Sequence, residues 1–299
     1  MSDPRIAAAL APTQTEHGSS RIAELQRCRV GHALRYEQHI EPIKKAVYFD
    51  TGHFVHGCLR LVNEAVIEGR EFPDWKAVIA FAREQREAKG ETVAWDEKDP
   101  IDEAEMCVER YYATHGEHNG GWPEAAKLLH AELFLEDREL EATCRADLVI
   151  EMGGEIIIPD TKTRARGLPK ERAEYARSLR TNEQFLRLSA LAQTHFGLSE
   201  PPPVWLDAII KTATRPKDPE AKWPVDRLLV QFTQQDVDRW RVNQARILDF
   251  EHSARHLPVI ANYHECAPAI GDRCWAFDWC HGTDETKARK FRVRGEQEK

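Results

Sequence analysis

Apolar positions recur with two different periods along the chain, and the period changes near residue 131. Before that point they are spaced by three and four residues, as in amphipathic helices. This pattern predicts helices over 20–39, 50–69, 74–115 and 122–130. Gly90 and Pro100 divide the third stretch into shorter pieces. The part of the chain before residue 131 is therefore expected to be helical.

After residue 131 the pattern becomes that of a sheet with further helices. Short apolar runs separated by polar turns predict strands over 131–136, 141–151, 155–161, 203–212 and 226–233. Gly153 and Gly154 form a plausible hairpin turn. Longer amphipathic stretches predict helices over 169–195 and 234–257. The expected fold class is α/β, a mixed central sheet with helices before, within and after it.

One predicted strand ends in two opposite charges. The isoleucine run in "EIIIPDTK" leads through Pro159 to Asp160 and Lys162. Residues two apart on a strand point to the same face, so the carboxylate and the ammonium project together. Such pairs are common at protein surfaces and contribute little there. The neighbouring strand makes this pair a candidate site.

A second carboxylate is expected beside Asp160. Asp147 lies in "CRADLVI", and a hairpin between 141–151 and 155–161 would bring the two side chains together. Two carboxylates held close repel one another unless a cation lies between them. Mg²⁺ or Mn²⁺, hard ions that prefer oxygen ligands, would serve. Lys162 could then orient an attacking water or offset charge on a phosphate oxygen.

The order of these residues resembles the RecB-like branch of the PD-(D/E)XK nucleases, which includes CRISPR-adaptation exonucleases and phage recombination nucleases. The matching residues are, in order, Gly52, His56, Glu132, Asp147, Asp160, Lys162 and Gln184. The resemblance covers roughly residues 20–285 and implies a restriction-endonuclease-like fold. One departure is Leu188, where the family has the Tyr of a Gln-x-x-x-Tyr helix.

The resemblance also implies a role for each position. His56, Asp147 and Asp160 would bind the metal, with the carbonyl of Thr161 as a further ligand. Lys162 would be the catalytic lysine.

Two further positions have an assisting role in the resemblance. Glu132 would help at a second metal or a water, and Gln184 would contact DNA or brace the site. The alternative for Glu132 is an ordinary solvated side chain, and for His56 a partly buried helix histidine.

Three cysteines lie close together in "NYHECAPAIGDRCWAFDWCHG". Cys266, Cys274 and Cys280 are separated by seven and then five residues. In a reducing compartment, clustered thiolates favour a metal site over disulfides. Zinc usually has C-x-x-C hooks, which are missing from this segment, but His264 and His281 leave zinc open.

The resemblance implies a [4Fe-4S] cluster, because several RecB-like nucleases hold one with a cysteine ahead of the nuclease core and three behind it. The ligands here would be Cys28, Cys266, Cys274 and Cys280, with zinc as the alternative. Arg29 stands where the family usually has Pro after the first cysteine. Such a cysteine-rich metal staple would close the N-terminal helical cap over the core, offsetting the chain entropy of a long loop.

The net charge of −8 argues against a surface that binds polyanions everywhere. From Lys162 to Arg180, however, there are seven basic and two acidic residues, a local charge of +5. A solvated helix face is the alternative, but the position beside the proposed site favours a surface that follows phosphates. The candidate DNA-binding side chains are Arg164, Arg166, Lys170, Arg172 and Lys211.

Four segments are expected in the chain. They are a poorly ordered tail over 1–18, a helical region over 19–130, a nuclease core over 131–257 and a cysteine-rich segment over 258–299. No apolar run approaches the roughly 18 residues that span a bilayer, and no secretory signal is recognisable, so the cytoplasm is the expected compartment.

The hypothesis is a metal-dependent DNA exonuclease acting at DNA ends in recombination, repair or phage DNA processing. No sequence pattern of a base-reading module is present, which favours ends over specific sites. The alternatives are a non-catalytic, metal-stapled DNA-binding scaffold and a CRISPR spacer-processing nuclease. Homo-oligomers and a recombination-protein partner both remain open.

Overall fold

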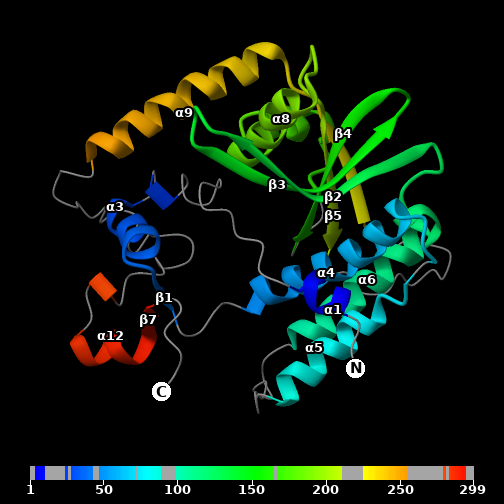
Figure 1. Cartoon of the computed structure of the whole chain (residues 1–299), viewed down its shortest axis with the longest axis horizontal. Helices are drawn as coiled ribbons and strands as arrows, with labels where there is room; N and C mark the ends of the chain where they lie inside the picture. Colours follow the sequence, from blue (N-terminus) through cyan, green and yellow to red (C-terminus); the bar gives the residue numbers. More distant parts are fainter. Residues whose placement is uncertain are drawn as a thin grey trace.

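A mixed five-stranded sheet forms the centre of the protein (Figure 1). The strands are β2 (Ala126–Asp137), β3 (Ala142–Met152), β4 (Glu155–Arg164), β5 (Val204–Ile210) and β6 (Val225–Val230). They are ordered β2-β3-β4-β5-β6, and β4 and β5 are parallel while the other neighbours are antiparallel. The sheet has the mixed α/β character predicted from the sequence.

The structure is a computed structural model. It describes residues 4–10, 24–25, 28–42, 47–71, 73–88, 99–164, 168–210, 225–254, 279–280 and 283–293. Within these ranges, none of the helices combines the length and the apolar character needed to cross a bilayer.

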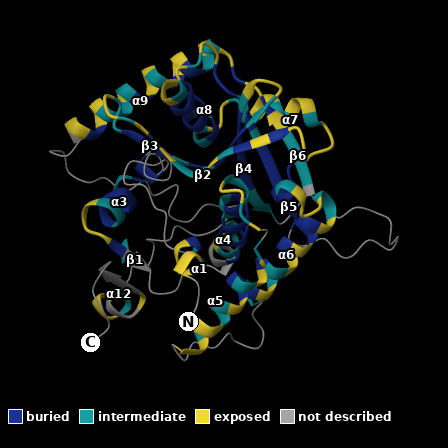
Figure 2. Ribbon diagram, turned by 45° about the vertical axis from the view of Figure 1, so that its right-hand side comes forward, coloured by how far each residue is buried: buried dark blue, intermediate teal, exposed yellow. Residues whose placement is uncertain are grey.

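Helices cover both faces of the sheet. On one face, α8 (Glu183–Phe196) and α9 (Gln234–Ala254) share an apolar core with the strands. On the other face lie α4 (Val47–Ile67), α5 (Lys76–Ala88) and α6 (Pro100–His115). Figure 2 shows the buried residues concentrated between these layers. The sheet is therefore the middle of three layers, as a restriction-endonuclease-like fold requires.

The crossover from β4 to β5 contains two helices where one was predicted over 169–195. The first is α7 (Arg172–Leu179), and the second is α8. Asn182 separates them, because its side chain accepts a hydrogen bond from the backbone N–H of Phe185 at 3.2 Å. Such an N-cap starts a new helix and ends the preceding one.

Two other helix predictions are wrong in part. Residues 126–130 belong to β2, where Ala126 and Leu128 are buried and Lys127 is exposed, a strand alternation stabilised by pairing with β3. The helix predicted over 20–39 is interrupted at Cys28, whose backbone is extended (φ −158°, ψ 114°). Only α3 (Arg29–His32) and the π-helical turn η1 (Ala33–Glu37) follow it.

Part of the expected tail is ordered. Residues Pro4–Ala9 form the helix α1, against the prediction of a poorly ordered segment over 1–18. Ile6 and Ala9 of this helix, and Leu10 just after it, pack in the core of α4, α5 and α6. Burial of these side chains stabilises the helix, which the composition of the segment alone did not reveal. Residues 11–18 lie outside the described ranges.

The segments before and after the five-stranded sheet meet in a second, two-stranded sheet. In it, β1 (Ile40–Pro42) pairs antiparallel with β7 (Phe291–Val293), which follows α12 (Asp284–Lys290). Figure 1 shows these elements beside α3, with α9 reaching toward them. At this junction His32 Nε2 of α3 is 3.9 Å from Glu251 Oε1 of α9. Segments far apart in the sequence are thus in contact.

The start of α9 provides a test of stability. Thr233 and Asp236 form a capping box, in which the Asp236 carboxylate accepts the Thr233 N–H at 2.9 Å and the Thr233 hydroxyl accepts the Asp236 N–H at 3.3 Å. Arg180 also donates to Asp236. We expect Asp236→Ala to lower the free energy of unfolding by about 1 kcal/mol at pH 7 in urea denaturation.

The effect of this substitution should depend on pH. Partial burial acts to raise the pKa of Asp236, but hydrogen bonds from Thr233 and Arg180 outweigh it and the pKa is lowered. The stabilisation is therefore complete above the ordinary aspartate pKa of about 3.9 and is lost as the pH falls through the lower folded-state value. Asp249→Ala, at an exposed position of the same helix, is the control. An equal loss in both variants would contradict the assignment.

Candidate active site

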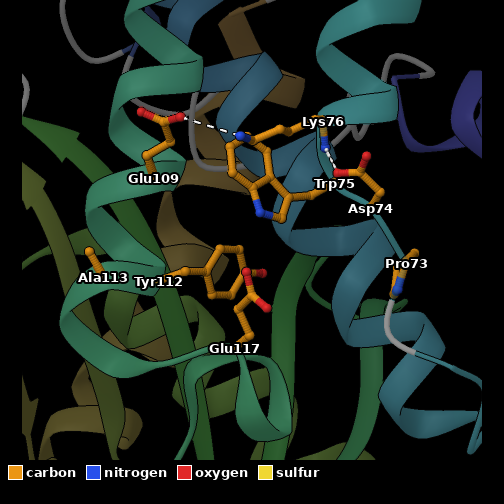
Figure 3. Close-up of a pocket in the computed structure, with 8 residues that line it drawn as sticks. All are labelled: Pro73, Asp74, Trp75, Lys76, Glu109, Tyr112, Ala113 and Glu117. Atoms are coloured by element: carbon orange, nitrogen blue, oxygen red, sulfur yellow. Dashed lines mark hydrogen bonds and ion pairs between the residues drawn. The ribbon is translucent and has the colours of Figure 1, made fainter.

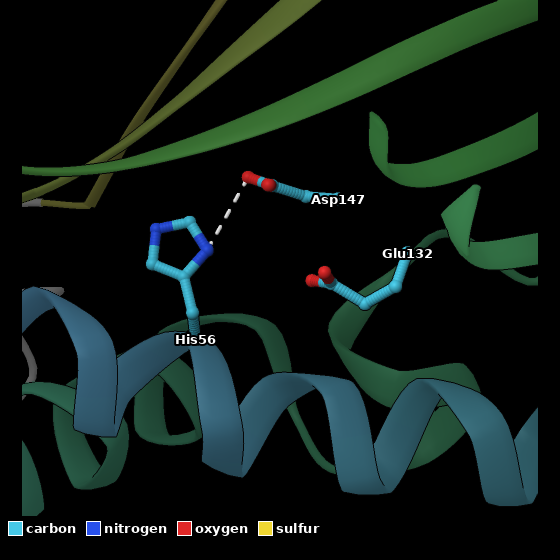
Figure 4. Close-up of side chains that lie close together, drawn as sticks. All are labelled: His56, Glu132 and Asp147. Atoms are coloured by element: carbon cyan, nitrogen blue, oxygen red, sulfur yellow. Dashed lines mark ion pairs between the residues drawn. The ribbon is translucent and has the colours of Figure 1, made fainter. Parts of the chain in front are cut away.

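The helix α4 carries His56 to the sheet. Gly52 lies one turn earlier, and a Cβ there would be 3.4 Å from Thr163 Oγ1 of β4. The helix and the strand are therefore close together at this point, with room for little more than a methyl group between them. His56 projects from this helix toward the strands (Figure 4).

Three possible metal ligands converge at this end of the sheet. Single ligand atoms of His56, Glu132 and Asp147 lie within 4.8 Å of one another. They come from α4, β2 and β3, and all three side chains are partly buried (Figure 4). His56 Nδ1 is 3.4 Å from Asp147 Oδ2. An imidazole with two carboxylates is a donor set suited to a divalent cation.

Irregular backbone brings Glu132 into this group. The register between β2 and β3 shifts between Leu128 and His130. Glu132 itself has a φ of 54°, a left-handed conformation that residues other than glycine seldom adopt. Bulges redirect side chains along a strand, and strained conformations concentrate at functional sites.

The facing strand β3 changes its alternation at Asp147. Ala146 and Val149 pack in the core beneath α8, whereas Leu148 and Ile150 pack in the cluster on the opposite face. A regular strand would place residues 146 and 148 on the same side. The alternation therefore changes at the carboxylate that faces α4.

Burial and like charge raise the pKa of Glu132 to about 7. Loss of hydration is the larger cause, and the negative charge of Asp147 adds to it. The positive fields of His56, Arg60 and Arg145 act in the opposite direction and do not cancel it. A bound cation would favour the ionised carboxylate.

Asp160 belongs to a second group beside the first. Its buried carboxylate is 2.9 Å from Lys162 Nζ through Oδ1 and 2.8 Å through Oδ2. Gln184 Nε2 of α8 donates to Oδ1 at 3.1 Å. Asp147 Oδ2 accepts the backbone N–H of Thr161 at 3.0 Å, which ties the two groups together. Among the described residues, Asp160 is not one of the three that converge within 4.8 Å.

The Asp160–Lys162 pair is electrostatically coupled. Burial raises the pKa of Asp160, although the ammonium of Lys162 opposes the shift. For Lys162, burial acts to lower the pKa, but the charges of Asp160 and Asp147 outweigh it and the pKa is raised. Lys162 therefore remains a cation at neutral pH, close to where substrate charge would develop.

Residues 19–281 match the sequence model of the PD-(D/E)XK nuclease superfamily. The chain belongs to this superfamily. Among solved structures, it is similar to a "putative exonuclease" from Eubacterium rectale at 13% identity, with a TM-score of 0.49 over 89% of this chain and 93% of that one. The search of curated proteins gave no match.

Membership of the PD-(D/E)XK superfamily makes the protein a hydrolytic nuclease with DNA as the substrate that the family implies. Nucleases of this superfamily usually use divalent metals, and the group of His56, Glu132 and Asp147 is the candidate metal site. Asp160 and Lys162, both within β4, form an Asp-x-Lys sequence, the pattern that appears in the name of the superfamily.

The basic side chains of the nuclease that were predicted to contact DNA have different surroundings. Arg164 Nη1 donates to the Tyr175 hydroxyl at 2.6 Å. Arg172 Nη2 lies 2.9 Å from Asp226 Oδ1, so its charge is partly neutralised. Lys170 is exposed. Two others, Arg166 and Lys211, lie outside the described residues.

The cysteines predicted to hold a cluster are only partly described. Cys28 is buried at the N-terminus of α3, and Cys280 is partly buried shortly before α12. Cys266 and Cys274 lie outside the described residues. The geometry of the predicted cluster is therefore not part of the described structure.

Sequence reasoning missed Arg60, which lines the same small cavity as His56, Glu132 and Asp147. Its spacing, one helical turn after His56, was the available signal. Trp122 also lines this cavity, from a segment that was predicted to be helical.

A larger hollow of about 580 Å³ lies between the start of α5 and the end of α6 (Figure 3). Its wall includes Trp75 stacked on Tyr112, with ring centroids 6.2 Å apart, and an ion pair between Lys76 and Glu109 at 3.6 Å. None of its lining residues belongs to the group of His56, Glu132 and Asp147.

The pKa of Glu132 predicts how metal binding depends on pH. Because a carboxylate must lose its proton to coordinate a cation, the affinity for Mn²⁺ should fall as the pH drops below about 7. We expect Glu132→Gln to bind Mn²⁺ at least about tenfold more weakly at pH 8, with a much flatter pH dependence. Isothermal titration calorimetry from pH 6 to pH 8, roughly spanning this pKa, measures both effects.

Two further variants serve as a positive and a negative control for this measurement. Asp147→Asn should weaken binding at every pH, whereas His118→Ala, at an exposed histidine outside the group, should leave it unchanged. If the Mn²⁺ affinity of Glu132→Gln depends on pH as strongly as that of the wild type, a group other than Glu132 loses its proton when the metal binds.

Proposed function

We propose that the protein is a RecB-like, metal-dependent exonuclease that hydrolyses phosphodiester bonds at DNA ends. The observation that carries the proposal is the convergence of His56, Glu132 and Asp147 beside the Asp160–Lys162 pair. The order of these residues along the chain matches that of RecB-like nucleases, which supports the finer assignment.

The residues present fit a divalent cation. We assign His56, Asp147 and Glu132 as ligands for Mg²⁺ or Mn²⁺, with Asp160 and the carbonyl of Thr161 as further ligands. The position of Asp160 supports this, because its neighbour Thr161 lines the same cavity as His56, Glu132 and Asp147, and the backbone N–H of Thr161 donates to Asp147 at 3.0 Å. When bound, the ion supplies Lewis acidity and lowers the pKa of a coordinated water.

The surrounding side chains hold the reacting groups in place. Lys162 keeps a positive charge where the scissile phosphate gains negative charge, and Asp160 fixes the position of its ammonium. Gln184 donates to the same Asp160 oxygen, so it restrains the carboxylate from the side of α8. This bracing is the role that we assign to Gln184.

The DNA path is proposed to run from Lys162 along α7. Lys170 is exposed there, and Arg164, although held by Tyr175, stays close to the exit of β4. With Arg166, Arg172 and Lys211 these side chains would neutralise backbone phosphates without reading bases.

We further propose that Cys28, Cys266, Cys274 and Cys280 hold a [4Fe-4S] cluster, with zinc as the alternative. The pairing of β1 with β7 supports this, because it holds the segment after Cys28 next to the segment after Cys280. A metal bound by these cysteines would join the cysteine-rich segment over 258–299 to the helical region over 19–130. The core over 131–257 lies between these two segments in the sequence.

The nuclease proposal is tested on DNA substrates. With Mn²⁺, the wild type should degrade linear DNA and leave covalently closed circles intact. Asp160→Ala and Lys162→Ala should each lower kcat by at least about a hundredfold, because charge stabilisation at the phosphate is lost.

The control is a charge substitution away from the proposed DNA path. Arg246→Gln removes an exposed charge from α9, away from the proposed path, and should keep wild-type activity. If the wild type and Asp160→Ala degrade linear DNA equally, the degradation does not depend on this site and the catalytic assignment fails. If neither degrades DNA but both bind it, the protein is a non-catalytic DNA-binding scaffold. Cleavage of closed circles would contradict the exonuclease assignment alone.

The cluster proposal is tested by spectroscopy. Anaerobically purified wild type should absorb broadly in the visible range and contain iron, whereas Cys274→Ser should lose the absorbance and unfold at a lower temperature. Cys144→Ala, at a buried thiol in the core beneath α8, should keep the spectrum. A colourless wild type that contains zinc would contradict the iron assignment and support the alternative.

A further inference from the structure

The helix α4 carries a guanidinium beside the candidate metal site that the assignments above do not use. Arg60 follows His56 by one helical turn and lines the same cavity as Glu132 and Asp147. Its positive field acts on Glu132, where it opposes the rise in pKa caused by burial and by Asp147. Arg60 therefore lies within electrostatic reach of the proposed metal ligands.

Two fixed contacts hold the guanidinium in place. Arg60 Nε donates to Glu64 Oε1 of the same helix at 2.7 Å, and Nη1 donates to the backbone carbonyl of Ala8 at 3.2 Å. The side chain is 19% exposed, so it is oriented but still in contact with solvent. A guanidinium has five N–H donors, and these two bonds leave others for an incoming acceptor.

The carbonyl that holds Arg60 comes from the N-terminal helix. α1 ends against one face of α4, where His53, Gly57 and Arg60 recur at helical spacing. His53 Nε2 lies 2.9 Å from the Leu10 carbonyl, so its N–H can donate there. A Cβ at Gly57 would lie 2.7 Å from Leu10 Cδ2. The carbonyls at the end of α1 are thus capped by side chains of α4.

The charges of the site explain why such a cation is needed. Glu132, Asp147 and Asp160 are acidic, and the Lys162 ammonium is already paired with Asp160. A phosphodiester that approaches this group meets carboxylates as well as cations. A guanidinium matches two phosphate oxygens with two parallel N–H groups, a geometry that an ammonium does not provide.

We propose that Arg60 is a positioning residue that binds a phosphate of the DNA strand next to the metal site, and that α1 sets its orientation through the carbonyl of Ala8. This inference rests on the proposed nuclease function. It gives the N-terminal helix a role in substrate binding, in addition to its packing on α4 and α5.

The test compares Arg60→Gln and Arg60→Lys with the wild type. Binding of a fluorescently labelled linear duplex is measured by anisotropy with Ca²⁺ in place of Mn²⁺, and cleavage is measured with Mn²⁺. We expect Arg60→Gln to bind DNA about tenfold more weakly and to lower the salt dependence of binding by about one charge. KM should rise by about the same factor, while kcat stays within about twofold of the wild-type value. This pattern is expected when a contact is equally strong in the ground state and in the transition state.

Arg60→Lys keeps the positive charge but lacks the two parallel N–H groups of the guanidinium. We therefore expect this variant to show the wild-type salt dependence of DNA binding and only part of the wild-type affinity. At about pH 8, above the pKa of Glu132, the affinity of Arg60→Gln for Mn²⁺ should stay close to that of the wild type. A structural role through Glu132 would instead change Mn²⁺ binding and leave the salt dependence unchanged, and that result would overturn the inference.

Arg70→Gln is the matched control. Arg70 follows the end of α4 and pairs with Glu68, so the variant removes one arginine charge from the same region. We expect unchanged DNA affinity. An equal loss in Arg70→Gln and Arg60→Gln would mean that only net charge matters, and the inference would fail.

The role of α1 is tested by deleting residues 1–10, alone and with Arg60→Gln. If α1 acts through Arg60, the deletion should weaken DNA binding in the wild-type background and add little in Arg60→Gln. Full additivity would overturn the role of α1. Circular dichroism and the melting temperature establish that each variant is folded. If the deletion variant does not fold, Gly57→Val replaces it, because a valine there would displace α1 without shortening the chain.

The outcomes separate this inference from the proposed function. If the wild type cleaves DNA and Arg60→Gln binds and cleaves equally well, the inference fails and the nuclease function stands. If the wild type does not cleave but Arg60→Gln loses DNA affinity, the catalytic proposal fails and the phosphate contact stands.

Discussion

The site depends on holding several acidic groups together at one end of the sheet. Glu132 and Asp147 repel one another, and their partial burial makes that repulsion costly, as the raised pKa of Glu132 shows. The surrounding structure offsets it with fixed donors. Asp147 accepts the Thr161 N–H, and Asp160 is held by Lys162 and Gln184. A protein tolerates such an arrangement where function requires it.

The position of α4 decides whether these groups can act together. Two of its glycines lie next to other elements: Gly52 faces Thr163 of β4, and Gly57 faces the end of α1. The helix lies between the sheet and the N-terminal segment, and it presents His56 and Arg60 to the cavity that contains the candidate metal site. Small displacements of α4 would change metal and substrate binding together.

The peripheral elements connect the ends of the chain. The pairing of β1 with β7, and the approach of His32 on α3 to Glu251 on α9, bring segments from both sides of the core into contact. Closing so long a loop costs chain entropy, which a metal–thiolate cluster would offset. This physical need is independent of the catalytic site, so the two proposals can fail separately.

The mixed sheet, most of its strands and the order of the acidic residues could be predicted from the sequence alone, because strand alternation and short-range spacing are local properties. Asp160 and Lys162 were paired by the two-residue period of β4 alone. The grouping of Glu132 with His56 and Asp147 depends on the packing of α4, β2 and β3, because a register shift and a left-handed backbone in β2 have no local sequence signal. The helix α1 and its contact with Arg60 likewise depend on the three-dimensional fold, since that helix is stabilised by burial against α4 and not by its own composition.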